Sequence, residues 1–440
     1  MLDLAKTLGD CSHLRVYNRA EKFIFFNPTI PSWVYSNATG AVALKIASQG
    51  FPIGQVVRIA ADNGISPKST EEFFETCLTA RLFEIGEKSE RWKNGTRSMR
   101  RLASIYLHLT NKCNLSCSYC YRNSSPRISI SRFGDEFNDF LDECREICGP
   151  SPQLTFSGGE PMIHPDFWSV AEHAKELGFA NSLLTNGTLV TPINAPALAQ
   201  MFEYIKISLD GASEETHAKT RGLENFELVI NAIHLLSQYS DTVDLEIQMT
   251  LNSDNMEEAA NLRDILPHGS RIKYTPLMGM GRGKQSESDD RISNDEFHSI
   301  SRQTDPLEGR GAIRLQNGQR TFGCYAGDAH ISVADNGDVY PCHLFHQNKF
   351  KMGNIFVDTI SDIFHSAKMT EFAESMDVEN NNARCASCDF RYLCGGGCKA
   401  NPLHEHKDHR KSDTFCGFIR NSLLDDMFAG WRGPDSRRLD

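Results

Sequence analysis

Hydrophobic and polar positions follow two different patterns along the chain, and the change between them divides it into regions. Residues 14–86 begin with two short runs rich in β-forming residues, 22–26 and 31–35, joined by a turn at Asn27 and Pro28. Apolar residues then recur at helical spacing in three segments: 38–48, 53–63 and 70–83. This pattern predicts a small unit of a β-hairpin and three helices, followed by a polar linker over 87–101.

From Leu102 onward, strand patterns alternate with helical patterns. The expected strands are 105–109, 153–156, 181–184, 204–209, 243–250 and 271–274. The expected helices between them include 137–148, 167–177, 226–238 and 256–266. Six strands with intervening helices predict an α/β fold, with a parallel sheet that is open or closed into a partial (β/α)6 barrel over residues 102–285.

The last region, 310–425, has a different character. Residues 279–296 lead into it as a polar exit loop, and 314–413 is rich in Gly, Asn and Cys but poor in long apolar periodicity. Such a segment needs support other than a large apolar core, and bound metal supplies it.

Composition and charge exclude several classes of function. The 440 residues carry a formal net charge of −11, which argues against a nucleic-acid partner. The start of the chain lacks the apolar region of a signal peptide, and no run of 18 apolar residues predicts a membrane span. We therefore expect no membrane association and a cytoplasmic location.

The fourteen cysteines are bunched rather than spread evenly. Four are scattered: Cys11, Cys77, Cys144 and Cys148. Three form a tight group at Cys113, Cys117 and Cys120, and the other seven lie between Cys324 and Cys416. In a long chain without an export signal, such bunching indicates metal or redox chemistry rather than disulfides.

The first group follows the first strand of the alternating region, with the spacing C-x3-C-x2-C. Thiolates at such short spacing hold iron–sulfur clusters, and three of them leave one iron of a [4Fe–4S] cube open for a non-protein ligand. The alternative is a zinc site or a set of buried thiols, but zinc prefers four closed ligands or a recognisable catalytic set.

This segment resembles the radical S-adenosylmethionine (SAM) superfamily, whose hallmark is the same spacing, with an aromatic residue (here Tyr119) before the last cysteine. Three further motifs match in order, one after each of the next strands. They are Gly158-Gly159-Glu160, the turn Asn186-Gly187, and the polar pair Ser208 and Asp210.

The resemblance implies how SAM is bound and used. The glycines would let the backbone approach the ligand, Glu160 would bind the methionine ammonium group, and Ser208 and Asp210 would meet the ribose. The cluster would supply an electron that releases a 5′-deoxyadenosyl radical, which abstracts an unactivated hydrogen atom from the substrate.

The second group resembles the SPASM extension of radical SAM enzymes, and all seven cysteines of that pattern are present. The resemblance implies auxiliary cluster II on Cys385, Cys388, Cys394 and Cys416. It implies auxiliary cluster I on Cys324, Cys342 and Cys398. With the first group, the chain would hold three [4Fe–4S] clusters. The alternative here is a zinc ribbon, although one four-ligand site would leave three cysteines over.

Some relatives have an eighth cysteine shortly before the first, and residues 315–323 contain none. The fourth ligand of auxiliary cluster I is therefore an open iron, a non-cysteine side chain or a substrate thiolate. Four nearby side chains are candidates, although a surface role is the simpler expectation for each: Asp328, His330, His343 and His346. A further group in a charged loop is expected to be solvated: His404, His406 and His409.

The first unit resembles the winged-helix, PqqD-like peptide-recognition domain of ribosomal-peptide maturases. There a leader peptide adds as an edge strand, a role for which residues 23–26, Trp33 and Tyr35 are available here. The alternative is a structural cap or a dimerisation domain.

Together these features predict an enzyme that modifies a leader-bearing precursor peptide, with a thioether or carbon–carbon crosslink as the product and flavodoxin or ferredoxin as electron donor. Three alternatives remain: a sulfatase-type maturase that forms formylglycine, a small-molecule enzyme such as one of haem biosynthesis, and an iron–sulfur electron carrier. The SAM-binding motifs argue against the carrier. The sequence identifies no general base.

Overall fold

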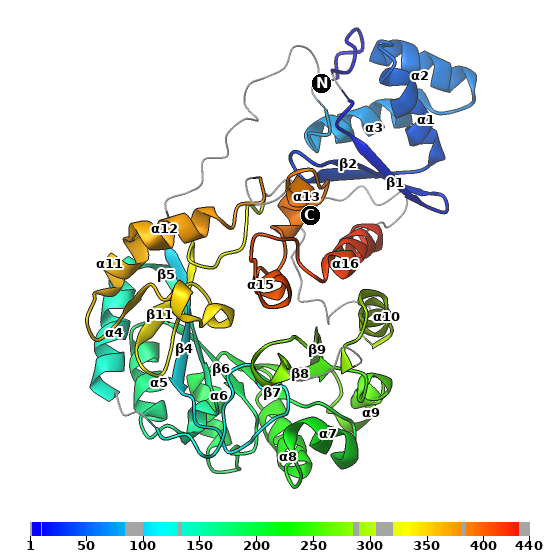
Figure 1. Ribbon diagram of the computed structural model, residues 1–440. Helices are drawn as coiled ribbons and strands as arrows, with labels where there is room; N and C mark the ends of the chain where they lie inside the picture. The colour runs from blue at the N-terminus through cyan, green and yellow to red at the C-terminus, as the bar shows by residue number, and fades with distance from the viewer. Residues whose placement is uncertain are drawn as a thin grey trace.

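The computed structural model describes residues 2–9, 11–83, 100–130, 134–284, 290–304, 320–379 and 383–430 (Figure 1). Most of the linker expected over 87–101 lies outside these ranges. The described part contains a small N-terminal unit, a large curved sheet with helices on its outer face, and a cysteine-bearing C-terminal region (Figure 1).

The N-terminal unit is a three-stranded antiparallel sheet packed against three helices. Its strands, in the order β1-β2-β3, are β1 (Arg15–Arg19), β2 (Lys22–Asn27) and β3 (Ser32–Ser36). Its helices are α1 (Ala38–Ala47), α2 (Ile53–Asp62) and α3 (Pro67–Thr79). The hairpin and the three helices agree with the sequence-based prediction. The extra strand β1 was missed because its residues are mostly exposed and carry little apolar signal.

The large sheet has nine strands in the order β12-β11-β10-β4-β5-β6-β7-β8-β9. The six predicted strands form its parallel part: β4 (Leu102–Thr110), β5 (Cys148–Gly158), β6 (Ala180–Thr185), β7 (Tyr204–Ser208), β8 (Asp244–Leu251) and β9 (Arg271–Pro276). Because consecutive strands are neighbours throughout, all crossovers run in one direction and the sheet curls as a partial barrel. This confirms the predicted α/β class.

The helices of this region cover the outer face of the sheet (Figure 1). They are α4 (Gly134–Ile147), α5 (Phe167–Glu176), α6 (Ala195–Met201), α7 (Glu214–Arg221), α8 (Phe226–Ser237) and α9 (Leu262–Ile265). The helix expected over 256–266 is shorter than predicted, a 3₁₀ turn followed by α9. Alternate residues of β4, such as Ile105 and Leu107, join the apolar core on this face. The residues between them, Tyr106 and His108, therefore face the inside of the barrel.

The C-terminal region extends the same sheet, which the sequence did not predict. Strand β10 (His330–Val333) pairs in parallel with β4, and β11 (Asp338–Tyr340) and β12 (Gly353–Asn354) complete the edge. The region also has an apolar cluster that includes Phe345 and Phe372. This cluster is much smaller than the core of the large sheet, and the sequence pattern did not indicate it because its apolar residues come from short elements without a long period.

Short helices make up the rest of the C-terminal region. They are α11 (Ile360–His365), α12 (Ala367–Glu374), α13 (Ala383–Ala386), α14 (Arg391–Cys394), α15 (Ala400–His406) and α16 (Cys416–Ala429). Helix α10 (Asn294–Thr304) packs against α16 and begins within the segment expected to be an exit loop.

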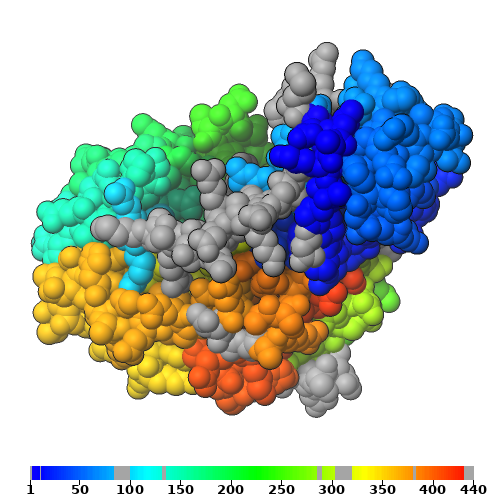
Figure 2. All heavy atoms as spheres, turned by 90° about the horizontal axis from the view of Figure 1, so that it is seen from above, coloured from blue at the N-terminus to red at the C-terminus, as the bar shows by residue number. Residues whose placement is uncertain are grey.

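The N-terminal sheet docks on this C-terminal region. Its free face contributes Ile24, Phe26 and Trp33 to an apolar cluster with Phe390 and residues of α16, and the rings of Phe26 and Phe390 stack with centroids 5.6 Å apart. Figure 2 shows the blue N-terminal unit in contact with the orange and red C-terminal segments. Strand β2 is the central strand of its sheet, so the expectation that residues 23–26 offer an edge was wrong.

Among the described residues, no helix is both long and apolar enough to cross a membrane.

Candidate functional site

The loop after β4 holds the first group of cysteines. Burial raises the pKa of Cys113 to about 12, with smaller contributions from Cys117 and Cys120, which therefore lie nearby. Such thiols become thiolates when a metal cation replaces their protons. Arg282 fixes the loop from the other side, since its guanidinium donates to the carbonyl oxygens of Cys117 at 2.8 Å and Ser124 at 2.9 Å. Nothing in the sequence pattern indicated this role for Arg282.

Two predicted glycines bring the end of β5 against this loop. Gly158 has a φ of +129°, and a Cβ there would lie 2.1 Å from the carbonyl oxygen of Thr110. A Cβ on Gly159 would lie equally close to the carbonyl oxygen of Lys112. Larger residues would force the two strand ends apart, so both positions need glycine.

Glu160 follows these glycines and is fully buried. Its carboxylate accepts hydrogen bonds from the Thr185 hydroxyl at 3.0 Å and from the backbone N–H of Asn186 at 2.8 Å. Burial nevertheless raises the pKa of Glu160 to about 7, because these hydrogen bonds only partly offset desolvation. The Asn186 side-chain amide also lies 3.7 Å from Cys113 Sγ, so the predicted Glu160 and Asn186 motifs meet beside the cysteine loop.

Asp210 lies two residues after the end of β7 and is also fully buried. Its carboxylate accepts hydrogen bonds from Arg221 Nε at 2.5 Å, from the Tyr119 hydroxyl and from the backbone N–H of Thr250. The sequence pattern did not indicate Arg221 as the partner of Asp210. Ser208 lies two residues before Asp210, on the inner face of the strand by alternation and less buried than Asp210.

Polar side chains line the inside of the barrel between this site and the C-terminal region. His108 is fully buried, and neither of its ring nitrogens has a hydrogen-bond partner among the described residues. The ring of His343 stacks on Tyr106 with centroids 4.1 Å apart, and His346 lies 4.8 Å from His108. The surface role expected for His343 and His346 was wrong, because both rings are enclosed between β4 and the loop after β11.

Lys206 of β7 belongs to the same interior, and burial lowers its pKa to about 8, with a further contribution from Lys273. We call this interior, lined by Tyr106, His108, Lys206, His343 and His346, the polar lumen. The signal that could have revealed it is the alternation of polar with buried apolar residues along β4 and β7.

The second group of cysteines forms two sets. In the first, burial raises the pKa of Cys342 and the neighbouring Cys324 and Cys398 thiols raise it further, so these three lie together. Lys399 is completely buried, its charge acts on the Cys324 thiol, and its ammonium group has no hydrogen-bond partner among the described residues. A buried cation without a partner is costly, and an anionic cluster held by the three thiolates would compensate its charge.

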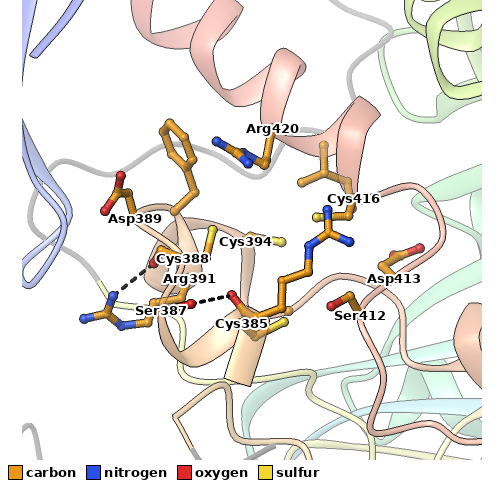
Figure 3. A pocket seen from close by; sticks show the side chains of 14 residues that line it. Cys385, Ser387, Cys388, Asp389, Arg391, Cys394, Ser412, Asp413, Cys416 and Arg420 are labelled. Atoms are coloured by element: carbon orange, nitrogen blue, oxygen red, sulfur yellow. Dashed lines mark hydrogen bonds between the residues drawn. The ribbon is translucent and has the colours of Figure 1, made fainter. Parts of the chain in front are cut away.

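The other set surrounds a pocket of about 250 Å³, shown in Figure 3. Cys385 of α13, Cys394 at the end of α14 and Cys416 at the start of α16 line it together with Cys388. Gly395 ends α14 in a left-handed conformation, with φ of +61°, which turns the chain around the pocket.

The thiols at these three places have the chemistry of iron–sulfur ligands, and at the set of Cys324, Cys342 and Cys398 the orphaned Lys399 ammonium group supports this fit independently of the cysteines. Of the three histidines expected to be solvated, two are not. His406 is exposed as predicted. His404 contacts the carbonyl oxygen of Leu344 at 3.2 Å, and His409 stacks on Phe372, so neither is simply solvated.

Comparisons with known proteins agree with this geometry. Residues 107–263 match the family model described as "Radical SAM superfamily", and residues 324–389 match SPASM, described as "Iron-sulfur cluster-binding domain". The chain is 27% identical to an AdoMet-dependent heme synthase of Methanosarcina barkeri, over 71% of this chain and 95% of that protein. It is 26% identical to the antilisterial bacteriocin subtilosin biosynthesis protein AlbA of Bacillus subtilis, over 82% of this chain and 83% of that protein.

Among solved structures, Streptococcus suis SuiB bound to precursor peptide SuiA matches with a TM-score of 0.58 and 15% identity. The match covers 93% of this chain and 99% of that one.

Proposed function

Because the chain belongs to the radical SAM superfamily of enzymes and carries an iron–sulfur-binding SPASM domain, we propose that it modifies a ribosomally made precursor peptide by radical hydrogen abstraction. The observation that carries this proposal is the extent of the fold likeness to SuiB. Because the match covers 93% of this chain, it must include at least part of the N-terminal unit. SuiB has been solved with a precursor peptide bound.

The chain's own residues would prepare the reaction. When bound, the first cluster supplies the electron that cleaves SAM into methionine and a 5′-deoxyadenosyl radical. Cys113, Cys117 and Cys120 would hold three irons of that cluster. The Glu160 carboxylate, which lies beside Cys113, would accept hydrogen bonds from the methionine ammonium group. Ser208 would contact the ribose. Asp210 would act mainly through Tyr119 and Arg221, because its carboxylate is already engaged by both of these side chains.

The polar lumen is the place for the reacting part of the substrate. His108 has two buried ring nitrogens without partners, and such a side chain is expected to bind a ligand or water. It lies on β4, two residues before Thr110, where the cysteine loop begins. A peptide side chain that enters here would meet both the SAM site and the loop that carries Cys342.

The N-terminal unit would recognise the leader of the peptide. Its sheet face is already packed against the C-terminal region, so a leader strand could add only at an edge, β1 or β3. β1 is the more exposed of the two, with Val16 55% exposed. The salt bridge from Arg15 of β1 to Asp389, the residue after Cys388, links this edge to the site of auxiliary cluster II.

The auxiliary clusters on the two SPASM cysteine sets would accept an electron from the product radical or bind the substrate, and flavodoxin or ferredoxin would supply reducing electrons. A thioether or carbon–carbon crosslink fits this chemistry, because each is a two-electron oxidation of the peptide.

A second candidate is a small-molecule reaction of the haem pathway, favoured by the 27% identity to the heme synthase. One experiment separates the two. The anaerobically reconstituted enzyme is given SAM, a reductant and a precursor peptide encoded beside its gene, with the leaderless core peptide as control. A mass decrease of two hydrogen atoms in the full-length peptide, with formation of a matching amount of 5′-deoxyadenosine, supports peptide modification. If no peptide encoded beside the gene changes in mass and a porphyrin-type substrate is turned over, the proposal of peptide modification would be overturned.

A further inference from the structure

We propose that His330 supplies the fourth ligand of auxiliary cluster I, through its Nε2 atom. This inference rests on the proposed function to the extent that Cys324, Cys342 and Cys398 hold a cluster there. It assigns an imidazole to the position for which the chain offers no fourth cysteine.

The geometry brings His330 to the thiols in two ways. One ligand atom each of His330, Cys342 and His343 lie within 4.8 Å of one another. His330 is also joined to the turn that carries Cys324, because its backbone N–H donates to the carbonyl oxygen of Tyr325 at 3.1 Å. His330 therefore belongs to the same turn as one thiol and lies beside another.

The ring of His330 is oriented as a metal-binding imidazole usually is. Its Nδ1 atom pairs with the Ser104 hydroxyl on β4 at 3.2 Å, whereas its Nε2 atom is buried and has no hydrogen-bond partner among the described residues. A metal-bound histidine typically uses its second nitrogen for such an orienting hydrogen bond. Tyr106 packs edge-on against the same ring at 5.3 Å and restricts its rotation further.

The competing side chains are already engaged. His346 pairs with Arg122 and with the Ser332 hydroxyl, and Asp328 forms a salt bridge with Arg100. The carboxylate of Asp413 accepts hydrogen bonds from Asn401 and from the backbone N–H groups of Cys398 and Phe415.

His343 has a different geometry from His330. Its Nδ1 atom lies 3.6 Å from Cys342 Sγ, which is hydrogen-bonding distance to sulfur, and its ring is held flat against Tyr106. We assign it as an N–H donor to the cluster thiolate. A neutral imidazole in place of a thiolate makes a cluster less negative and raises its reduction potential, as does a hydrogen bond to a ligand sulfur. Both histidines would thus favour electron uptake by auxiliary cluster I.

The test uses full-length protein in which Cys113, Cys117 and Cys120 are replaced by Ala, so that only auxiliary clusters contribute to the spectra. Pulsed EPR of the reduced protein, with natural and ¹⁵N-labelled histidine, detects a nitrogen bound to iron. We expect a strong histidine nitrogen coupling that is lost in His330→Cys, with a shift of one midpoint potential to a more negative value. His343→Gln should keep the coupling and shift the potential, and His365→Ala, an exposed histidine of α11, should change neither.

Absence of the coupling in a protein with full iron content for two auxiliary clusters would overturn the ligand assignment alone, as would its persistence in His330→Cys. Iron for only one auxiliary cluster, or zinc at this site, would instead overturn the three-cluster proposal together with the ligand. His330→Cys is preferred to His330→Ala because a thiolate can still complete the cluster, so a lost nitrogen signal does not depend on a lost cluster.

Discussion

Arg221 and Asp210 form an ion pair of 2.5 Å, and their side chains are at most 8% exposed. Arg221 also donates to the hydroxyl of Tyr119 at 2.5 Å, so the pair connects the end of β7 to the loop that carries the first cysteines. A residue expected to contact the ribose is therefore also part of the support for the cluster loop.

Breaking this pair should destabilise the protein. Arg221→Met leaves the buried Asp210 carboxylate without its cation, which costs on the order of 3–5 kcal/mol of unfolding free energy. The double variant Asp210→Asn, Arg221→Met should recover part of this loss, because it removes the uncompensated charge. Urea unfolding of the two variants and the parent measures the difference. Equal stability of single and double variants would show that the charge pair is not the cause.

Glu160→Gln should weaken SAM binding while leaving the first cluster in place. Loss of a charged hydrogen-bond acceptor costs about 1.5–3 kcal/mol, which is a roughly 10- to 150-fold rise in Kd. Equilibrium dialysis with labelled SAM gives the Kd, and iron analysis gives the cluster content. The control is Glu258→Gln, which removes a carboxylate that accepts from Ser213 and Thr216 at the start of α7. An unchanged Kd in Glu160→Gln would contradict the assigned role.

Lys206 should make stability depend on pH. Because burial lowers its pKa from 10.5 to about 8, the unfolded chain binds a proton between these pH values that the folded chain has released. The unfolding free energy should therefore rise with pH across this window. Below pH 8 the buried ammonium group is charged, so the full free-energy cost of burying that charge destabilises the folded protein.

The variant Lys206→Met removes that cost, so it should be more stable than the parent at pH 7 by up to about 3 kcal/mol. The gain should shrink as the pH approaches 10.5. Denaturant unfolding at several pH values measures it, with Lys219→Met, an exposed lysine of α7, as control. A gain that does not vary with pH would exclude Lys206 as its source.

Lys399 should raise the reduction potential of the auxiliary cluster beside it. Its buried ammonium group stabilises the extra negative charge of a reduced cluster, so Lys399→Met should move a midpoint potential to a more negative value. An EPR-monitored redox titration measures the shift, with the exposed Lys407→Met as control. Identical potentials in the parent and Lys399→Met would contradict this role.

The sequence predicted the parts of the molecule that depend on local pattern. All six strands of the parallel sheet were expected, because short runs rich in β-forming residues alternate with helical patterns there. The motif at Glu160 was also expected, and the structure brings it next to Cys113. Strands β10 to β12 were not expected, because they are at most four residues long and the pairing of β10 with β4 joins segments more than 200 residues apart.

The supporting residues of the site were missed for a similar reason. Arg221, Arg282 and Lys399 act through contacts that exist only after folding, and no motif in the sequence marks them. The histidines were placed on the surface because a polar residue in a loop is usually solvated. The folded chain instead encloses His330 and His343 between β4 and the cysteine-bearing loops.

The cluster that Cys113, Cys117 and Cys120 would hold should cleave SAM, so the decisive measurement is 5′-deoxyadenosine formation in anaerobically reconstituted, reduced protein. We expect this product from the parent protein and none from the variant with all three cysteines replaced by Ala, even though that variant keeps the iron of its auxiliary clusters. Formation of 5′-deoxyadenosine by the variant at the parent's rate would contradict this expectation.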